Sequence, residues 1–188
     1  MASPETLWTI GHSNHSLERF LSLVHAERIE AIADVRSWPR SRYAPWFDRE
    51  PLARALQQAG VRYVFLGREL GGRPDDPLLY DEAGHVRYDA VAATDVFRAG
   101  LDRLQHGLAR LRVAVMCAEE DPRHCHRRLL VARVLHERGL TILHARGDGT
   151  VQAEAGFTRP DSLFEEQLPW TSTASVSRRP LPRISSAA

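Results

Sequence analysis

The sequence predicts a three-layer α/β fold, with one domain built on a largely parallel five-stranded sheet that carries helices on both faces. Two observations predict it. Over residues 1–150, short apolar runs alternate with segments whose apolar residues recur at helical spacing, which is typical of βαβ units. The length of 188 residues, 43% of them hydrophobic, allows one core of this kind and not two.

The first half of the chain predicts a βαβαβ succession. We expect strands at residues 7–10, 29–35 and 61–66, because each is a short apolar run that ends at glycine or at polar residues. We expect helices at 16–27 and 48–58, because their apolar residues recur every three to four positions. Strands joined in this way form a Rossmann-like parallel sheet.

The second half continues the alternation after a long connection. Residues 67–88 are rich in Gly, Pro and Asp and predict a loop. Helical spacing follows at 91–111 and again at 123–138, where Asp121 and Pro122 suit the start of a helix. The last two strands are expected at 113–116 and 140–144.

The regular alternation stops near residue 150. Residues 151–170 contain enough apolar side chains to form an arm that packs on the domain. Residues 171–188 are rich in Ser, Arg and Pro with little to bury, so we expect a disordered tail there.

The composition excludes several kinds of chemistry. All 25 basic side chains are arginine, and lysine is absent. A side-chain Schiff base is therefore impossible, which excludes pyridoxal-phosphate catalysis and lysine-dependent aldolases, and a lysine-bearing phosphate loop is excluded as well. The 24 acidic residues leave a formal net charge of +1, so any anion site has to be local. We assign no cofactor.

The chain begins with neither the basic start nor the apolar run of a secretory signal, and no stretch reaches the ~18 apolar residues that a membrane span needs. We therefore expect a cytoplasmic protein with no membrane partner. Two cysteines in a reducing compartment are thiols or metal ligands. The oligomeric state stays open.

Reactive side chains gather at the predicted strand ends. In open parallel sheets, ligands bind outside the carboxyl ends of the strands. We therefore expect widely separated residues to line one pocket, with an ordinary buried ion pair of Asp34 and Arg127 as the alternative. The residues placed at this edge are His12, Ser13, Asp34, Arg36, Cys117, Glu119, Cys125 and Arg127. We expect catalytic roles for His12, Asp34, Cys117 and Glu119, and substrate-binding roles for the others.

The segment after Asp34 interleaves arginines with aromatic residues. Guanidinium groups pair with phosphates and flat rings stack on bases, so Arg40, Arg42 and Tyr43 join the expected substrate-binding residues. The alternative is that the aromatic side chains pack the loop onto the domain while the arginines are solvated. The composition does not decide between the two.

Cys117, Cys125 and the histidines beside Cys125 raise the question of a zinc site. The spacing lacks a tight Cys-x2-Cys pair, and one turn of a regular helix does not direct residues 124, 125 and 126 to one point. We therefore assign no metal. Two small buried thiols remain an alternative.

Together these motifs resemble a prokaryotic family known as domain of unknown function 488. The matching segments are TIGHS at residues 9–13, DVR at 34–36, YVFLGRELGG at 63–72, MCAEE at 116–120 and CHR at 125–127. The resemblance spans about residues 8–147. It implies an α/β domain with these motifs at one site, and it implies no established reaction or cofactor.

The expected function is an enzyme that acts on a phosphate-bearing substrate, a nucleotide or a nucleic-acid base, by lysine-independent hydrolysis or glycosyl transfer. The arginines would hold phosphate, and Asp34 or Glu119 would act as a base or stabilise a cationic transition state. One alternative is a binding module for nucleotides or nucleic acid that performs no chemistry. Another is thiol redox or metal-dependent chemistry at Cys117 and Cys125.

Overall fold

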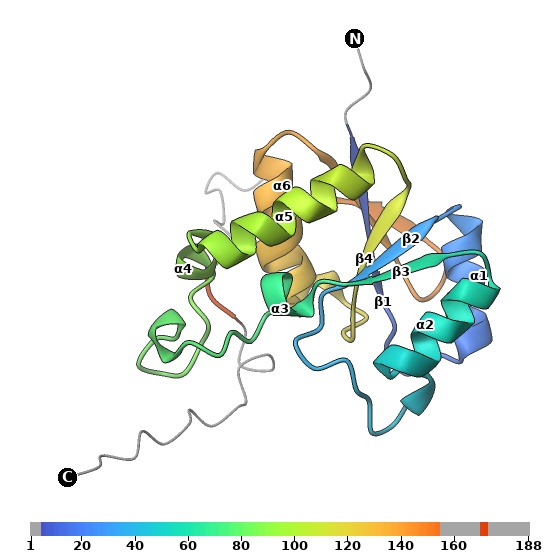
Figure 1. Ribbon diagram of the computed structural model, residues 1–188, viewed down its shortest axis with the longest axis horizontal. Coiled ribbons are helices and arrows are strands. Elements are labelled where there is room, and N and C mark those ends of the chain that lie inside the picture. The colour runs from blue at the N-terminus through green and yellow to red at the C-terminus, as the bar shows by residue number, and fades with distance from the viewer. Residues whose placement is uncertain (1–4, 155–169, 173–188) are drawn as a thin grey trace.

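The computed structural model describes residues 5–154 and 170–172, and its described part contains one sheet. The sheet has the strand order β3-β2-β4-β1-β5-β6 (Figure 1). The predicted α/β class is confirmed, but the sheet has six strands and not five. The strands are β1 (Thr6–Gly11), β2 (Ala31–Asp34), β3 (Arg62–Phe65), β4 (Val113–Cys117), β5 (Thr141–Ala145) and β6 (Val151–Ala153).

Strand β6 is the one that the sequence pattern did not predict. It is the antiparallel edge strand, in which Ala153 pairs with Leu143 and Val151 with Ala145 of β5. It has three residues, two of them exposed, so it carries no apolar run. A turn with Gly149 at φ 97° leads into it.

Helices cover both faces of the sheet, and each face has its own apolar core. Helices α1 and α2 cover one face, and the remaining α-helices with the π-helical turn η4 cover the other (Figure 1). The α-helices are α1 (Leu17–Ala26), α2 (Arg49–Gln58), α3 (Gly67–Leu70), α4 (Tyr88–Ala92), α5 (Asp95–Leu108) and α6 (Arg133–Glu137). The other helical segments are the 3₁₀ turns η1 (Pro45–Phe47), η2 (Pro77–Leu79) and η3 (Pro122–His124), and η4 (Arg127–Ala132).

Two predicted helices are interrupted, which corrects the sequence-based boundaries. The helix expected at 91–111 is divided into α4 and α5, because the Thr94 hydroxyl accepts a hydrogen bond from the Phe97 amide and starts a new helix. The helix expected at 123–138 is divided into η3, η4 and α6. At Cys125 the backbone is extended, with φ −117° and ψ 137°, so the chain leaves η3 before η4 begins.

The chain returns to the domain at Trp170. The Tyr88 amide donates to the Trp170 carbonyl at 2.8 Å, and the Arg133 guanidinium lies 3.8 Å from the centroid of the Trp170 indole. Residues 151–153 of the predicted arm form β6, whereas residues 155–169 and all but two residues of the predicted tail lie outside the described residues. None of the described helices is long and apolar enough to cross a membrane.

A buried ion pair joins η4 to the edge of the sheet. The Arg128 guanidinium donates to the Glu154 carboxylate at 2.7–3.1 Å, and His144 Nε2 donates to the same carboxylate at 2.8 Å. On the other side of the imidazole, the Thr9 hydroxyl donates to Nδ1 at 2.7 Å. Burial raises the pKa of Glu154, but His144 and Arg128 outweigh it and hold that pKa below its ordinary value. Burial also lowers the pKa of His144.

This pair predicts acid sensitivity. The folded protein binds protons less readily than the unfolded chain at both residues, because both pKa values are lowered in the folded state. The free energy of unfolding should therefore decrease as the pH is lowered, below about pH 6.5 because of His144 and below about pH 4.5 because of Glu154 as well. Glu154→Gln leaves a buried charge without its partner and costs about 3 kcal/mol at neutral pH. The difference in the free energy of unfolding between the variant and the wild type should narrow as the pH falls below about 4.5, because the Glu154 carboxyl of the unfolded chain is then protonated while the folded protein still holds it ionised.

Urea denaturation over this pH range measures both effects. The matched control is Glu137→Gln, because this carboxylate is half exposed and its pair with Arg133 is worth less than about 1 kcal/mol. A gap for Glu154→Gln that stays constant with pH would contradict the assignment.

Candidate functional site

Three neighbouring strands end at one cavity of about 270 Å³. Gly11 of β1 pairs with Cys117 of β4, and Asp34 of β2 pairs with Met116 of β4. Because these strands are parallel, the segments that follow them leave the sheet at the same edge. The described residues that line the cavity are His12, Arg36, Ser37, Trp38, Arg40, Ser41, Gly72, Arg73, Cys117, Ala118, Glu119, Cys125 and His126.

The structure brings together part of the expected set. Six of the expected residues line the cavity, namely His12, Arg36, Arg40, Cys117, Glu119 and Cys125. Asp34 and Arg127 are wholly buried behind them. Ser13, Arg42 and Tyr43 are not among the lining residues, and Tyr43 is 78% exposed.

The segments after β1 and β4 are joined through their backbones. The His12 amide donates to the Cys117 carbonyl at 3.0 Å, and the Ser13 amide donates to the Ala118 carbonyl at 2.9 Å. The approach is so close that a Cβ on Gly11 would lie 1.9 Å from the Glu119 carbonyl oxygen. Only glycine fits there, which gives the Gly11-His12 motif a structural reason.

Asp34 holds Arg36 in place. Its carboxylate accepts from the Arg36 amide at 3.1 Å and from Arg36 Nε and Nη2 at 2.9 and 2.6 Å. The Tyr63 hydroxyl donates to the same carboxylate at 2.7 Å. Burial, followed by the Asp34 charge, raises the pKa of Tyr63, so the phenol remains a donor. Asp34 therefore faces Arg36 and Tyr63, and the alternative pairing of Asp34 with Arg127 is wrong.

His12 is held as a neutral ring. Its Nδ1 donates to the Ser13 carbonyl at 2.8 Å, so Nε2 is the unprotonated atom that accepts from Arg36 Nη1 at 3.0 Å. The ring stacks on Phe47 with 4.4 Å between centroids. Burial and then Arg36 lower the pKa of His12 to about 4. At neutral pH the ring accepts a hydrogen bond from Arg36 and orients that guanidinium towards the cavity.

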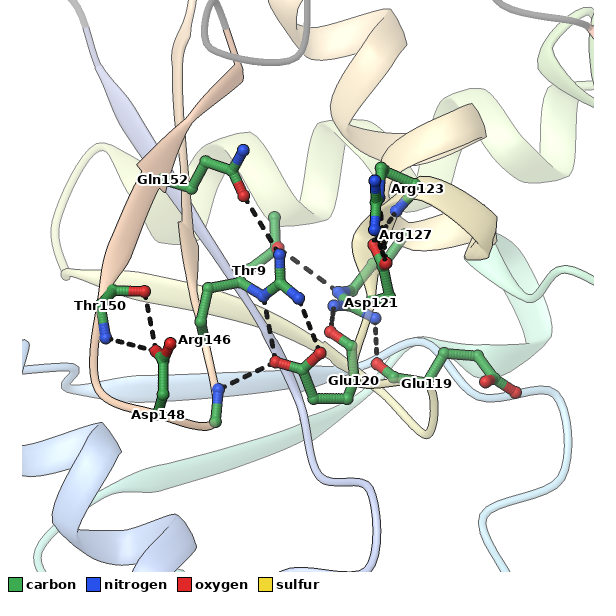
Figure 2. Close-up of polar contacts among 11 residues, drawn as sticks. Thr9, Glu119, Glu120, Asp121, Arg123, Arg127, Arg146, Asp148, Thr150 and Gln152 are labelled. Atoms are coloured by element: carbon green, nitrogen blue, oxygen red, sulfur yellow. Dashed lines mark hydrogen bonds and ion pairs between the residues drawn. The ribbon is translucent and has the colours of Figure 1, made fainter.

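Arg127 organises the segment after β4. Its guanidinium donates to the carbonyls of Glu119 and Glu120 and to the Thr9 hydroxyl (Figure 2). The carboxylate of Glu120 in turn binds Arg146 at 2.8 and 3.0 Å. Figure 2 shows that the Glu119 side chain extends away from these contacts. Among the described residues, Glu119 forms no ion pair, and it is one of the residues that line the cavity.

Cys117, Cys125 and His126 meet at the wall of the cavity. The Nδ1 atom of His126 lies 3.6 Å from Cys117 Sγ and 3.9 Å from Cys125 Sγ. The Cys125 hydrogen bond and burial raise the pKa of Cys117. Burial opposes ionisation of Cys125, but Cys117 and Arg127 outweigh it and hold the pKa of Cys125 below its ordinary value. The hydrogen bond between the two cysteines therefore favours a single thiolate in the pair over two.

His126 lines the cavity, although the sequence alone raises it only as a candidate zinc ligand and leaves it out of the expected site. A regular helix would have turned residues 125 and 126 to different sides, but the extended backbone at Cys125 brings both to Cys117. A Cβ on Gly72 would lie 2.5 Å from His126 Cγ, so the glycine leaves room for the ring. The Gly71-Gly72 pair in the sequence is therefore a signal of close packing that could have been used.

The loop after β2 contains both packed and exposed side chains. Phe47 is buried against His12 and Phe20, so one aromatic ring packs the loop onto the domain. Trp38 lines the cavity and is 56% exposed. Arg42 and Tyr43 lie together outside the lining set, with the Arg42 guanidinium carbon 6.0 Å from the ring centroid. Phe47 packs as the alternative expected, whereas Arg40 and Trp38 line the cavity, so substrate binding by this loop stays a prediction.

The fold and the site define an α/β protein with a strand-edge cavity rich in arginine and sulfur. The chain belongs to the family described as Domain of unknown function DUF488, whose model matches residues 16–134. The matched segment contains Asp34, Cys117 and Cys125, and it leaves out β1 with His12. No curated protein and no solved structure matches the chain.

The buried pair predicts a large cost for Asp34→Asn. The substitution keeps the shape but leaves the Arg36 charge, 4% exposed, without a carboxylate, so the free energy of unfolding should fall by about 3 kcal/mol. Asp89→Asn is the control, because its pair with Arg87 is half exposed and worth less than about 1 kcal/mol. Urea unfolding at neutral pH compares the two. Equal losses would show that Asp34 does not hold Arg36.

Proposed function

We propose that the protein is an enzyme that acts on a phosphate-bearing substrate, a nucleotide or a nucleic-acid base, bound in the cavity at the sheet edge. The reaction class is hydrolysis or glycosyl transfer. One observation carries the proposal. The described residues that line the cavity include three arginines, one tryptophan and one acidic residue, which are Arg36, Arg40, Arg73, Trp38 and Glu119.

The arginines supply the anion site. Within residues 5–154 and 170–172, Arg40 and Arg73 form no ion pair, so their charges are available to a ligand. The hydroxyls of Ser37 and Ser41 lie in the same lining. Guanidinium groups bind phosphate oxygens in a bidentate manner, and hydroxyls add further hydrogen bonds. Arg36 is already oriented by Asp34, so it meets the substrate without a further ordering cost.

The indole supplies a surface for a base. Trp38 lies on the same loop as Arg40, so a base stacked on the ring would place its phosphate near the guanidinium groups. Arg42 and Tyr43 follow on that loop outside the cavity. In the proposed complex they contact the parts of a longer nucleic acid that extend beyond it.

Glu119 is the proposed catalytic base or cation-stabilising group. Among the described residues that line the cavity it is the only carboxylate. Asp34 is bound on both oxygens by Arg36 and Tyr63, so its proposed part is to position Arg36. The sequence alone predicts either Asp34 or Glu119 as the base. We propose instead that Asp34 positions Arg36 and that Glu119 carries out the chemistry.

The proposal predicts turnover that depends on Glu119. A panel of nucleosides, nucleotides, single-stranded DNA and DNA with modified bases is incubated with the protein, and products are followed by chromatography. Glu119→Gln should keep substrate affinity and lose about 10²–10⁴ in rate, because general acid–base catalysis contributes that much. Glu50→Gln, in an exposed position on α2, is the control and should change neither.

Two outcomes would contradict the enzyme. Binding without turnover on any member of the panel would favour the non-catalytic binding module. Absence of both binding and turnover would reject the substrate class.

The arginines predict the salt dependence. Arg40→Ala and Arg73→Ala should each weaken the binding of a nucleotide and reduce the slope of log affinity against log salt, because one fewer phosphate contact remains. Arg54→Ala, an exposed arginine on α2, is the control. Fluorescence anisotropy with a labelled oligonucleotide measures the slope. Slopes that match the wild type in both variants would place the phosphate elsewhere.

A further inference from the structure

We propose that Cys117, Cys125 and His126 bind one Zn²⁺ ion at the wall of the cavity, with an open fourth position that faces the cavity. The ligand atoms are the two Sγ atoms and His126 Nδ1, and all three lie within 4.8 Å of one another. All three residues are buried and line the cavity. The site does not depend on the substrate class proposed above.

The spacing of the donor atoms fits a tetrahedral zinc ion. Zinc binds thiolate sulfur at about 2.3 Å and imidazole nitrogen at about 2.0 Å, which puts a sulfur and a nitrogen about 3.5 Å apart at the tetrahedral angle. The observed distances from His126 Nδ1 are 3.6 Å to Cys117 Sγ and 3.9 Å to Cys125 Sγ. The Cys125 distance exceeds the expected spacing by a few tenths of an ångström, so binding requires Cys125 Sγ to move closer to His126 Nδ1.

The histidine is already in the form that a metal needs. Its Nε2 lies 3.0 Å from the Val35 carbonyl oxygen, which can only accept, so Nε2 carries the proton. The lone pair of the neutral ring is therefore on Nδ1, the atom that faces both sulfurs. Histidine ligands of metals are fixed in this way by a hydrogen bond from the other ring nitrogen.

The surroundings support a cation with soft ligands. Two thiolates and one Zn²⁺ ion are neutral together, which suits a buried position. Sulfur and imidazole donors favour Zn²⁺ over Mg²⁺ or Ca²⁺, which prefer oxygen. Structural zinc sites have four protein ligands, whereas catalytic ones have three and an open position. Three ligands beside a cavity match a catalytic zinc site, in which the fourth position is open to water or to a donor atom of a bound molecule.

The alternatives to a metal ion are a disulfide between Cys117 and Cys125 and a hydrogen-bonded pair of thiols. A hydrogen-bonded thiol network would also satisfy all three residues, because the thiol of Cys117 or Cys125 can donate to the His126 Nδ1 lone pair at the observed distances, whereas a disulfide would leave that lone pair without a donor. Uptake of a metal ion by the reduced protein is therefore the measurement that separates the zinc site from a hydrogen-bonded thiol pair.

Spectroscopy of the wild-type protein tests the site without reference to activity. The full chain is reduced, freed of metal with a chelator and titrated with Co²⁺, which reports ligand type and geometry. We expect one equivalent to give thiolate-to-cobalt charge-transfer absorption and the intense visible bands of tetrahedral Co²⁺, and Zn²⁺ to abolish both. Mass spectrometry should find that Zn²⁺ slows alkylation of Cys117 and Cys125. A reduced protein that takes up neither metal overturns the proposal.

Variants identify the ligands. Cys117→Ser, Cys125→Ser and His126→Gln should each weaken Zn²⁺ binding by more than about 100-fold, since loss of a supporting second-shell partner alone costs about 10–100-fold. His124→Gln is the control, because this histidine is exposed and lies outside the cluster. Circular dichroism checks that each variant folds. If a variant does not fold, the effect of Zn²⁺ on alkylation of Cys117 and Cys125 in the wild-type protein tests the site in its place. An unchanged cobalt spectrum in folded His126→Gln would overturn the site.

Discussion

The arrangement of the strand-edge cavity depends on one buried cation. The Arg127 guanidinium donates to two consecutive carbonyls, those of Glu119 and Glu120, and to the hydroxyl of Thr9. Hydrogen bonds from a charged donor contribute about 1.5–3 kcal/mol each when buried. The carbonyls belong to the segment that leaves β4, so this contact fixes the path of that segment across the end of β1. Glu119 reaches the cavity beside Cys117, the last residue of β4, because that path is fixed.

Much of the fold could be predicted, because its central strands are buried on both faces. The apolar runs at β1, β2 and β4 leave few other structures for the chain. Prediction failed where a local hydrogen bond competes with helical periodicity, as at Thr94, where a side-chain cap divides one apolar pattern into two helices. It also failed at β6, because an exposed edge strand has no core-facing run to reveal it.

The site could be predicted in position more than in detail. Parallel topology alone brings the ends of β1, β2 and β4 together, so His12, Arg36 and Cys117 share one edge. The partner of each charged side chain could not be predicted, because it depends on side-chain directions that the hydrophobic pattern of the sequence does not contain. Asp34 therefore lies behind Arg36, and its role could not be read from the sequence. The position of His126 beside Cys117 depends on the extended backbone at Cys125, which helical periodicity in the sequence does not reveal.

The π-helical turn η4 limits how this region can vary in length. A π-helical turn holds about one residue more than an α-helical turn. In η4 two consecutive side chains serve different places, since Arg127 binds the segment after β4 and Arg128 pairs with Glu154 beside the sheet edge. Adding or removing one residue would rotate one end of the helix against the other by about 100° and part both arginines from their partners. The segment should therefore accept exchanges of apolar side chains far more readily than insertions or deletions.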